Sequence, residues 1–181
     1  MKFAYADPPY IGQAKKHYSH DPQCAEVDHR ELIALLMSEY PDGWALSLSS
    51  PSLKQVLSIA PDTSRVMAWI KPFCAFKANV NPAYAWEPVI VNGGRKRGRD
   101  VATVRDFHSA NISLQKGLCG AKPESFCHWI CDVLGAQPED EMHDIYPGTG
   151  VMGLVWEQRR NFTTYPGEYS QPLQEKLGGW R

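Results

Sequence analysis

The chain has 181 residues, of which 43% are hydrophobic and 22% charged, and its formal net charge is −1. This length and composition predict one globular domain, and no apolar run is long enough to span a membrane. A net charge near zero argues against a uniformly basic nucleic-acid coat protein. The odd cysteine count of five and a start that leads directly into an apolar segment predict reduced thiols, a cytoplasmic location and no signal peptide.

The first predicted element is a buried strand over residues 2–6, followed by Asp7-Pro8-Pro9-Tyr10. Consecutive prolines cannot continue a sheet ladder, so the strand must end there. Asp7 can accept an N–H hydrogen bond, the Pro8 carbonyl can accept a second, and the Tyr10 ring can stack on a planar group. The tetrapeptide therefore suits a planar amine, although a tight turn with an N-cap aspartate is an equally simple interpretation.

The middle of the chain predicts strands and helices in alternation. Asp28 is a candidate N-cap for a helix over residues 29–40, whose leucines have helical spacing. The other predicted elements here are strands over residues 44–49, 65–70 and 84–91 and a helix over residues 52–59. Pro88 interrupts the last strand, which predicts an edge position or a bulge. Residues 11–27 show no periodic pattern and are predicted to form a polar loop.

The last third predicts a helix over residues 123–134 closed by Gly135, a strand over residues 143–146 and a helix over residues 151–159. Between the last two lies the segment Asp144–Gly150, which ends in Gly-x-Gly. Such a loop lets the backbone approach a ligand closely, and the following helix N-terminus offers N–H groups to an anion. It lacks the third glycine of a dinucleotide fingerprint and the lysine of a phosphate-binding loop. We assign residues 1–165 to the domain and 166–181 to an irregular tail.

Strands that alternate with helices predict an α/β fold with a mostly parallel sheet and helices on both faces. Ligands of such sheets bind beyond the carboxyl ends of the strands. Asp7 and Gly148 each follow a predicted strand directly. We therefore expect these two distant segments to share one pocket.

Together these motifs resemble a known family. Asp7-Pro8-Pro9-Tyr10 is similar to the catalytic motif of S-adenosylmethionine-dependent amino-methyltransferases, which modify exocyclic nitrogens of adenine or cytosine, and Asp144–Gly150 is similar to their cofactor loop. The order, with the catalytic motif first, resembles the circularly permuted (β-order) DNA methyltransferases and the mRNA-adenosine methyltransferases. Length and loop sequence most resemble small phage-type DNA N6-adenine methyltransferases. The resemblance covers residues 2–158 and implies a Rossmann-like methyltransferase fold.

The resemblance also implies roles for individual residues. The catalytic residues would be Asp7, Pro8, Pro9 and Tyr10, with the Tyr10 ring stacked on the target base. The cofactor S-adenosyl-L-methionine would be bound by Asp7, Lys122, Asp144, Tyr146, Pro147, Gly148, Thr149, Gly150, Glu157 and Gln158. In this set Lys122 would neutralise the cofactor carboxylate, and Glu157 and Gln158 would hold its ribose. A plain helix start at Lys122 and an exposed helix end at Glu157-Gln158 are the structural alternatives.

A strongly basic segment, Gly93–Arg99, suggests contact with phosphates. Its cationic side chains, Arg95, Lys96, Arg97 and Arg99, can neutralise phosphates without reading sequence. Lys15 and Lys16 form a smaller cluster, and a solvated surface is the alternative for both. DNA is the expected partner, with RNA as the alternative, in a bacterial or phage-infected cytosol. The protein is expected to act as a monomer or a homodimer.

Two other features have ordinary structural explanations. Cys127, His128 and Cys131 suggest zinc, but they lack the paired Cys-x-x-Cys spacing of structural sites, so we predict core thiols and no metal. Glu87, in Trp86-Glu87-Pro88, either faces the substrate base or is a strand-end carboxylate.

Substrate choice depends on the first motif position. The aspartate at Asp7 resembles adenine-modifying enzymes, whereas cytosine-N4 enzymes more often have serine and protein-glutamine methyltransferases have asparagine there. We therefore expect methyl transfer to the exocyclic N6 of adenine in DNA. A cytosine-N4 DNA enzyme, an adenine-N6 RNA enzyme and a non-catalytic nucleic-acid-binding module with the same fold remain alternatives.

Overall fold

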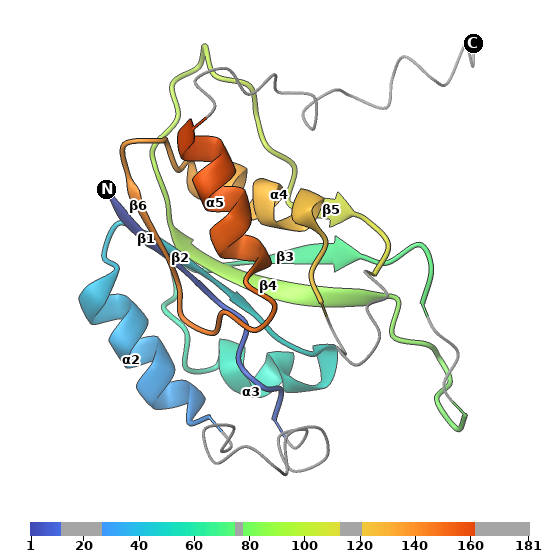
Figure 1. The fold of residues 1–181 in the computed structure, drawn as a ribbon. Coiled ribbons are helices and arrows are strands. Elements are labelled where there is room, and N and C mark those ends of the chain that lie inside the picture. The colour runs from blue at the N-terminus through green and yellow to red at the C-terminus, as the bar shows by residue number, and fades with distance from the viewer. Residues whose placement is uncertain (12–26, 75–77, 113–120, 162–181) are drawn as a thin grey trace.

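The computed structural model describes residues 1–11, 27–74, 78–112 and 121–161 (Figure 1). The predicted polar loop with Lys15 and Lys16, and the predicted tail, lie almost entirely outside these residues. In chain order the strands are β1 (Lys2–Ala6), β2 (Gly43–Ser47), β3 (Arg65–Ile70), β4 (Trp86–Gly93), β5 (Phe107–Ser109) and β6 (Glu141–Asp144). The helices are α2 (His29–Glu39), the short 3₁₀ helix η1 (Ser50–Ser52), α3 (Leu53–Leu57), α4 (Glu124–Leu134) and α5 (Val151–Asn161).

The strands form one six-stranded sheet in the order β5-β3-β4-β2-β1-β6. β1 pairs in parallel with β2 and β6, and β3 pairs in parallel with β5. β4 is antiparallel to both of its neighbours, β2 and β3, so it alone runs against the other five strands. The mostly parallel α/β sheet predicted from the sequence is confirmed.

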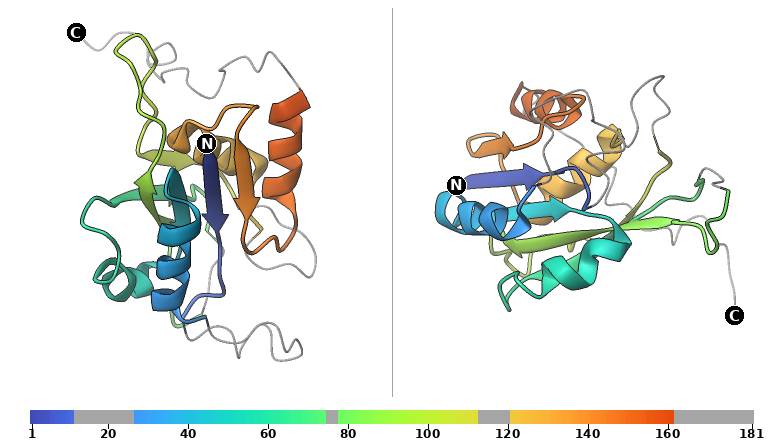
Figure 2. Two further views of the ribbon diagram at one scale, coloured as in Figure 1. Left: turned by 90° about the vertical axis from the view of Figure 1, so that its left-hand side faces the viewer. Right: turned by 90° about the horizontal axis from the view of Figure 1, so that it is seen from below.

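Both faces of the sheet are covered by helices (Figure 2). Side chains alternate between the two faces of a strand, and β1 shows this alternation directly. Phe3 and Tyr5 pack into the core beneath α4 and α5, whereas Ala4 and Ala6 pack into the core beneath α2 and α3. Because both faces of β1 are buried, the sequence of this strand is a continuous apolar run. No helix within the described residues is long and apolar enough to cross a membrane.

Local sequence signals set the ends of the two longest predicted helices. The Asp28 side chain accepts hydrogen bonds from the backbone N–H groups of Arg30 and Glu31, which confirms it as the N-cap of α2. Gly135 ends α4 in the left-handed conformation, with φ = 68°, and its N–H donates to the carbonyl of Asp132.

The strand containing Pro88 is placed differently from the prediction. β4 lies inside the sheet rather than at an edge. A strand residue directs its N–H and C=O to the same side, and the Pro88 carbonyl accepts from the N–H of Leu48 at 3.2 Å, just past the end of β2. The N–H that proline lacks would face Leu48, so this pair makes only one of its two ladder bonds and β2 ends at Ser47.

Candidate active site

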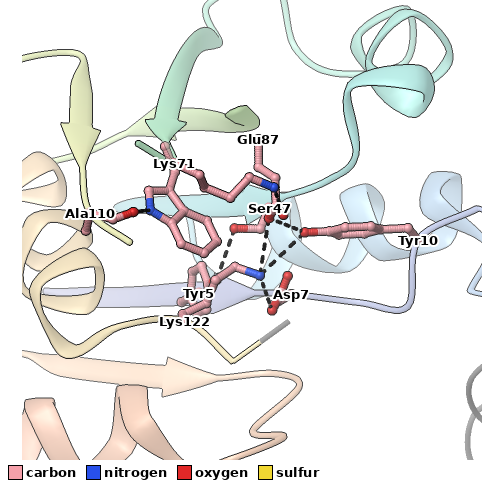
Figure 3. Close-up of polar contacts among 9 residues, drawn as sticks. Tyr5, Asp7, Tyr10, Ser47, Lys71, Glu87, Ala110 and Lys122 are labelled. Atoms are coloured by element: carbon pink, nitrogen blue, oxygen red, sulfur yellow. Dashed lines mark hydrogen bonds and ion pairs between the residues drawn. The ribbon is translucent and has the colours of Figure 1, made fainter. Parts of the chain in front are cut away.

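The structure brings Asp7 together with a lysine from a distant part of the chain. Asp7 follows the carboxyl end of β1, and Lys122 immediately precedes Pro123, the N-cap of α4. The Lys122 ammonium lies 2.7 Å from Oδ2 of Asp7 (Figure 3). The side chain of Lys122 is 6% exposed and that of Asp7 is 23% exposed. The ion pair is therefore largely buried on the lysine side and open to a ligand on the aspartate side.

Glu87 connects this pair to Tyr10 and to a second lysine. The Tyr10 hydroxyl donates to Oε2 of Glu87 at 2.6 Å, and the Lys71 ammonium donates to Oε1 at 2.9 Å. Lys122 lies 3.6 Å from Oε2 of the same carboxylate. The Tyr10 ring is thus held by the hydrogen bond of its hydroxyl to Glu87, and this bond does not involve the face of the ring. Two carboxylates and two ammonium groups compensate each other, so the network, seen in Figure 3, has little net charge.

The period-two alternation of strands explains why these groups meet. Tyr5 and Trp69 belong to the core beneath α4, and Glu87 is two residues from Val89 of the same core. Because every second side chain of a strand points to the same face, all three point to the face that α4 covers. The Tyr5 hydroxyl lies 3.0 Å from the Ser47 hydroxyl, and the Trp69 indole N–H donates to the Ala110 carbonyl at 2.9 Å. These hydrogen bonds hold two buried aromatic rings at the base of the site.

Burial and neighbouring charges set the protonation of the network. Burial raises the pKa of Asp7 above its ordinary value, Lys122 opposes the rise and Glu87 adds to it. Burial also favours the uncharged forms of Glu87 and Lys122, but their opposite charges prevail, which lowers the pKa of Glu87 and raises the pKa of Lys122. Burial and the adjacent carboxylates raise the pKa of Tyr10 well above its ordinary value. At neutral pH we therefore expect a charged Lys122 and Glu87 and a protonated Tyr10.

The Asp144–Gly150 loop lies beside this site because β6 and β1 are parallel neighbours. Asp144 is the register partner of Tyr5, and the Ile145 N–H donates to the Tyr5 carbonyl at 2.9 Å. This placement puts both motifs at the carboxyl edge of the sheet, as expected, and a pocket shared by the two stays a prediction. Oδ1 of Asp144 is buried and has no hydrogen-bond partner among the described residues. Burial raises the pKa of Asp144 to about 6, and nearby Asp7 adds to the rise.

Replacing Asp144 by Asn tests this buried carboxylate. Its raised pKa means that ionisation opposes folding: the contribution to stability is present below the unfolded pKa and is lost as pH rises through about 6. After discounting for partial exposure, we expect the loss to be about 1–2 kcal/mol. Asp144→Asn should therefore raise the free energy of unfolding at pH 8 relative to wild type, but not at pH 4. Urea unfolding at both pH values measures this, and equal effects at both would contradict it.

The loop glycines adopt conformations that other residues resist. Gly148 has φ = 47° and Gly150 has φ = 73°. The Gly150 N–H donates to the Pro147 carbonyl at 2.6 Å, and its own carbonyl accepts from the Leu154 N–H at 3.0 Å, so it links the turn to the first turn of α5. A Cβ on Gly150 would meet no described atom within 4 Å, which leaves its Cα side open for a ligand.

Two glycine substitutions three residues apart should have opposite effects. Gly150→Ala should destabilise the fold by about 1 kcal/mol because its φ of 73° is strained for alanine. Gly153→Ala, in α5 with equally open space and no unusual φ, should stabilise it by about 0.5–1 kcal/mol. Thermal unfolding of the two variants measures the difference. A Gly150→Ala variant as stable as Gly153→Ala would show that the positive φ is not required.

The basic segment Gly93–Arg99 lies at the other end of the sheet. Gly93 pairs with Gly43 at the start of β2, so the segment is separated from Asp7 by the length of β1, about 15 Å. Arg95 makes two hydrogen bonds to the Asp140 carboxylate, at 2.6 and 2.8 Å, and Arg97 donates to backbone carbonyls of Ala102 and Asp132. The segment therefore does not flank the candidate site, and its contact with phosphates stays a prediction. Lys96 and Arg99 are its exposed cations without such a described contact.

Glu157 and Gln158 are also not brought to the loop. Both are exposed on α5, and Glu157 lies about 9 Å along the helix from Val151 and pairs with Arg160 at 3.6 Å. Cys127 and Cys131 are fully buried, which confirms them as core thiols, and burial raises the pKa of Cys131 to about 12. No group of three potential ligands within the described ranges could hold a metal ion.

Sequence reasoning missed two parts of the network. Lys71 was not considered, although it follows β3 directly, as Asp7 follows β1. Ser47 was also missed, although it ends β2. Both residues are polar and lie at or just after the end of a strand, and this position could have indicated that they belong to the site. The bridging position of Glu87 depends on the reversed direction of β4, which no local pattern indicated.

The chain has a Rossmann-like methyltransferase fold, with the candidate site at the carboxyl edge of its parallel strands. The solved structure of the M1.HpyAVI–SAM complex matches with a TM-score of 0.59 at 14% identity over 88% of this chain and 78% of that chain. The structure of M1.HpyAVI matches with a TM-score of 0.54 at 14% identity, over 88% and 77%. No protein-family model and no curated protein sequence matches the chain.

Proposed function

We propose that this protein is an S-adenosylmethionine-dependent methyltransferase that acts on the exocyclic N6 of adenine in DNA. The observation that carries the proposal is the arrangement at one sheet edge: the Asp7 carboxylate and the Tyr10 ring lie next to the Asp144–Gly150 loop. The fold and one similar solved structure, a complex with SAM, support the same conclusion.

The residues of the loop fit this cofactor chemically. SAM carries an ammonium group and ribose hydroxyls that need acceptors, and Asp144 provides a buried oxygen without a described partner. The carboxylate of SAM needs donors, and the backbone N–H groups at the start of α5 provide them. Lys122, which the resemblance implied for that carboxylate, is already neutralised by Asp7 and Glu87. We therefore assign the carboxylate to the α5 N-terminus and Lys122 to the acceptor side of the site.

SAM would supply an activated methyl group, so the protein's own residues need mainly to orient the acceptor amine. Among the described residues Lys122 engages Oδ2 of Asp7, which leaves Oδ1 to accept an N–H from the amine. This hydrogen bond, with a second to the Pro8 carbonyl, favours rehybridisation of the amine nitrogen. As the nitrogen gains a methyl group it must lose a proton, and an ionised Asp7 can accept it.

The network also suits a neutral nucleobase. Its charges compensate, so a base meets little net charge. Tyr10 is fixed by its hydrogen bond to Glu87, and its ring can stack on the base after the base leaves the duplex. Asp7 at the first motif position favours adenine over cytosine, by the resemblance described above.

A methyl-transfer assay tests the proposal. Purified protein is incubated with isotopically labelled SAM and, in parallel, unmethylated duplex DNA, single-stranded DNA and RNA. Nucleosides are then identified by mass spectrometry. Labelled N6-methyladenine in DNA is expected. Label in N4-methylcytosine, or in RNA alone, would replace the substrate and keep the chemistry. No label and no SAM binding would contradict the enzyme proposal and favour a binding module.

A further inference from the structure

Exposed aromatic side chains are concentrated in one segment of the protein. Phe73, Tyr84 and Trp86 are 56%, 49% and 40% exposed. Within the described ranges they are the aromatic members of the set of large exposed apolar side chains, and the others are aliphatic or methionine. Phe73 and Tyr84 lie between β3 and β4, and Trp86 is the first residue of β4. We call residues 71–74 and 78–86 the aromatic hairpin.

The aromatic hairpin begins and ends in the candidate active site. Lys71 at its start and Glu87 directly after it form the ion pair that helps hold Tyr10. The connection projects beyond the carboxyl end of β3, away from the sheet (Figure 1). Trp86 is adjacent to Glu87 but points to the opposite face of the strand, so it is not part of the network around Asp7. The exposed rings therefore lie next to the site without closing it.

The charge of this region indicates a polyanionic partner. From Lys71 through Trp86 the sequence contains no Asp or Glu, although the chain has 20 acidic residues, and it contains Lys71 and Lys77. Of these two lysines, Lys71 is paired with Glu87. Exposed rings in a stretch without acidic residues suit single-strand recognition, in which bases stack on the rings and phosphates meet no opposing negative charge. The basic segment Gly93–Arg99 cannot serve this purpose near the site because it lies at the other end of the sheet.

We propose that the aromatic hairpin is a stacking platform for unpaired nucleotides that flank the target base. This inference rests on the proposed function, since an extruded base leaves neighbours that have lost a stacking partner. Phe73, Tyr84 and Trp86 stack on those neighbours, and the hairpin has no acidic side chain that would repel the adjacent phosphates. Stacking accepts every base, so the hairpin binds single strands with little sequence preference.

The test is the affinity of the full chain for a fluorescein-labelled, mixed-sequence single-stranded DNA of about 20 nucleotides, measured by anisotropy at one fixed salt concentration. Trp86→Ala and Phe73→Ala should each raise Kd by roughly 5-fold to 100-fold. Trp86→Phe keeps a ring and should stay near wild type. Leu35→Ala removes a 45% exposed apolar side chain from α2 and should leave Kd unchanged. Thermal unfolding checks that every variant is folded.

Methyl transfer and SAM binding of the wild type separate this inference from the proposed function. If the wild type transfers methyl groups and the Kd of the alanine variants stays within about twofold of wild type, the platform is wrong and the proposed function stands. The wild type can instead fail to bind SAM while the alanine variants lose affinity for single-stranded DNA. That result would support the platform and overturn the proposed function. If Trp86→Ala instead converts a wild-type dimer into monomers without changing Kd, the rings bind a second copy of the chain and the platform is wrong.

Discussion

Asp7→Asn is expected to lower kcat for methyl transfer by about 10²- to 10⁴-fold, the range for removal of a positioned proton acceptor or of a key electrostatic contact. Asparagine keeps the size of the side chain and can still accept a hydrogen bond, but it cannot accept the proton that the amine loses. SAM binding should change by only a few fold, because Asp144 and the α5 N-terminus provide the proposed cofactor contacts. Steady-state kinetics and calorimetry measure the two effects separately.

Asp106→Asn is the matched control for this substitution. The Asp106 side chain is 62% exposed and lies 3.7 Å from Arg65, away from the network around Asp7, so its loss should leave kcat within about twofold. An Asp7→Asn enzyme with near wild-type kcat would remove Asp7 from the reaction. Loss of SAM binding in the same variant would instead assign Asp7 to the cofactor.

Lys122→Met should be the most destabilising of the proposed substitutions, by about 3–5 kcal/mol, because it leaves Asp7 and Glu87 beside each other without their shared cation. Without Lys122 the pKa of Asp7 rises further, since burial and Glu87 then act unopposed by it. A raised folded-state pKa adds stability at low pH that is lost as pH rises through it. The cost of Lys122→Met should therefore be largest at neutral pH and shrink toward acid.

The same substitution should move the acid limb of the pH–rate profile. If Asp7 acts as the carboxylate, a higher pKa means that a higher pH is needed to ionise it, so the pH of half-maximal rate should increase. Adding Asp7→Asn should restore part of the lost stability, because the buried charge is then removed. Lys2→Met, at a 38% exposed lysine, is the control and should change neither property. An unshifted acid limb would mean that ionisation of Asp7 does not limit the rate.

Local signals in the sequence determined where several helices and strands begin and end. The apolar run of β1, the prolines after Asp7, the Asp28 cap and the Gly135 stop act within a few residues, so the ends of these elements follow from nearby chemistry. The alternation of strands and helices also determined that Asp7 and the glycine loop meet, since parallel strands present their carboxyl ends at one edge.

Tertiary structure alone decided which strand lies beside which and in what direction. Periodicity reports that a strand is buried, but it carries no information about its neighbours, so β4 could be predicted as an edge strand although it is internal and reversed. That reversal brings Glu87 to the site and carries Gly93–Arg99 to the opposite end. The contact between Asp7 and Lys122 joins groups 115 residues apart, and only the packing of α4 on the sheet creates it.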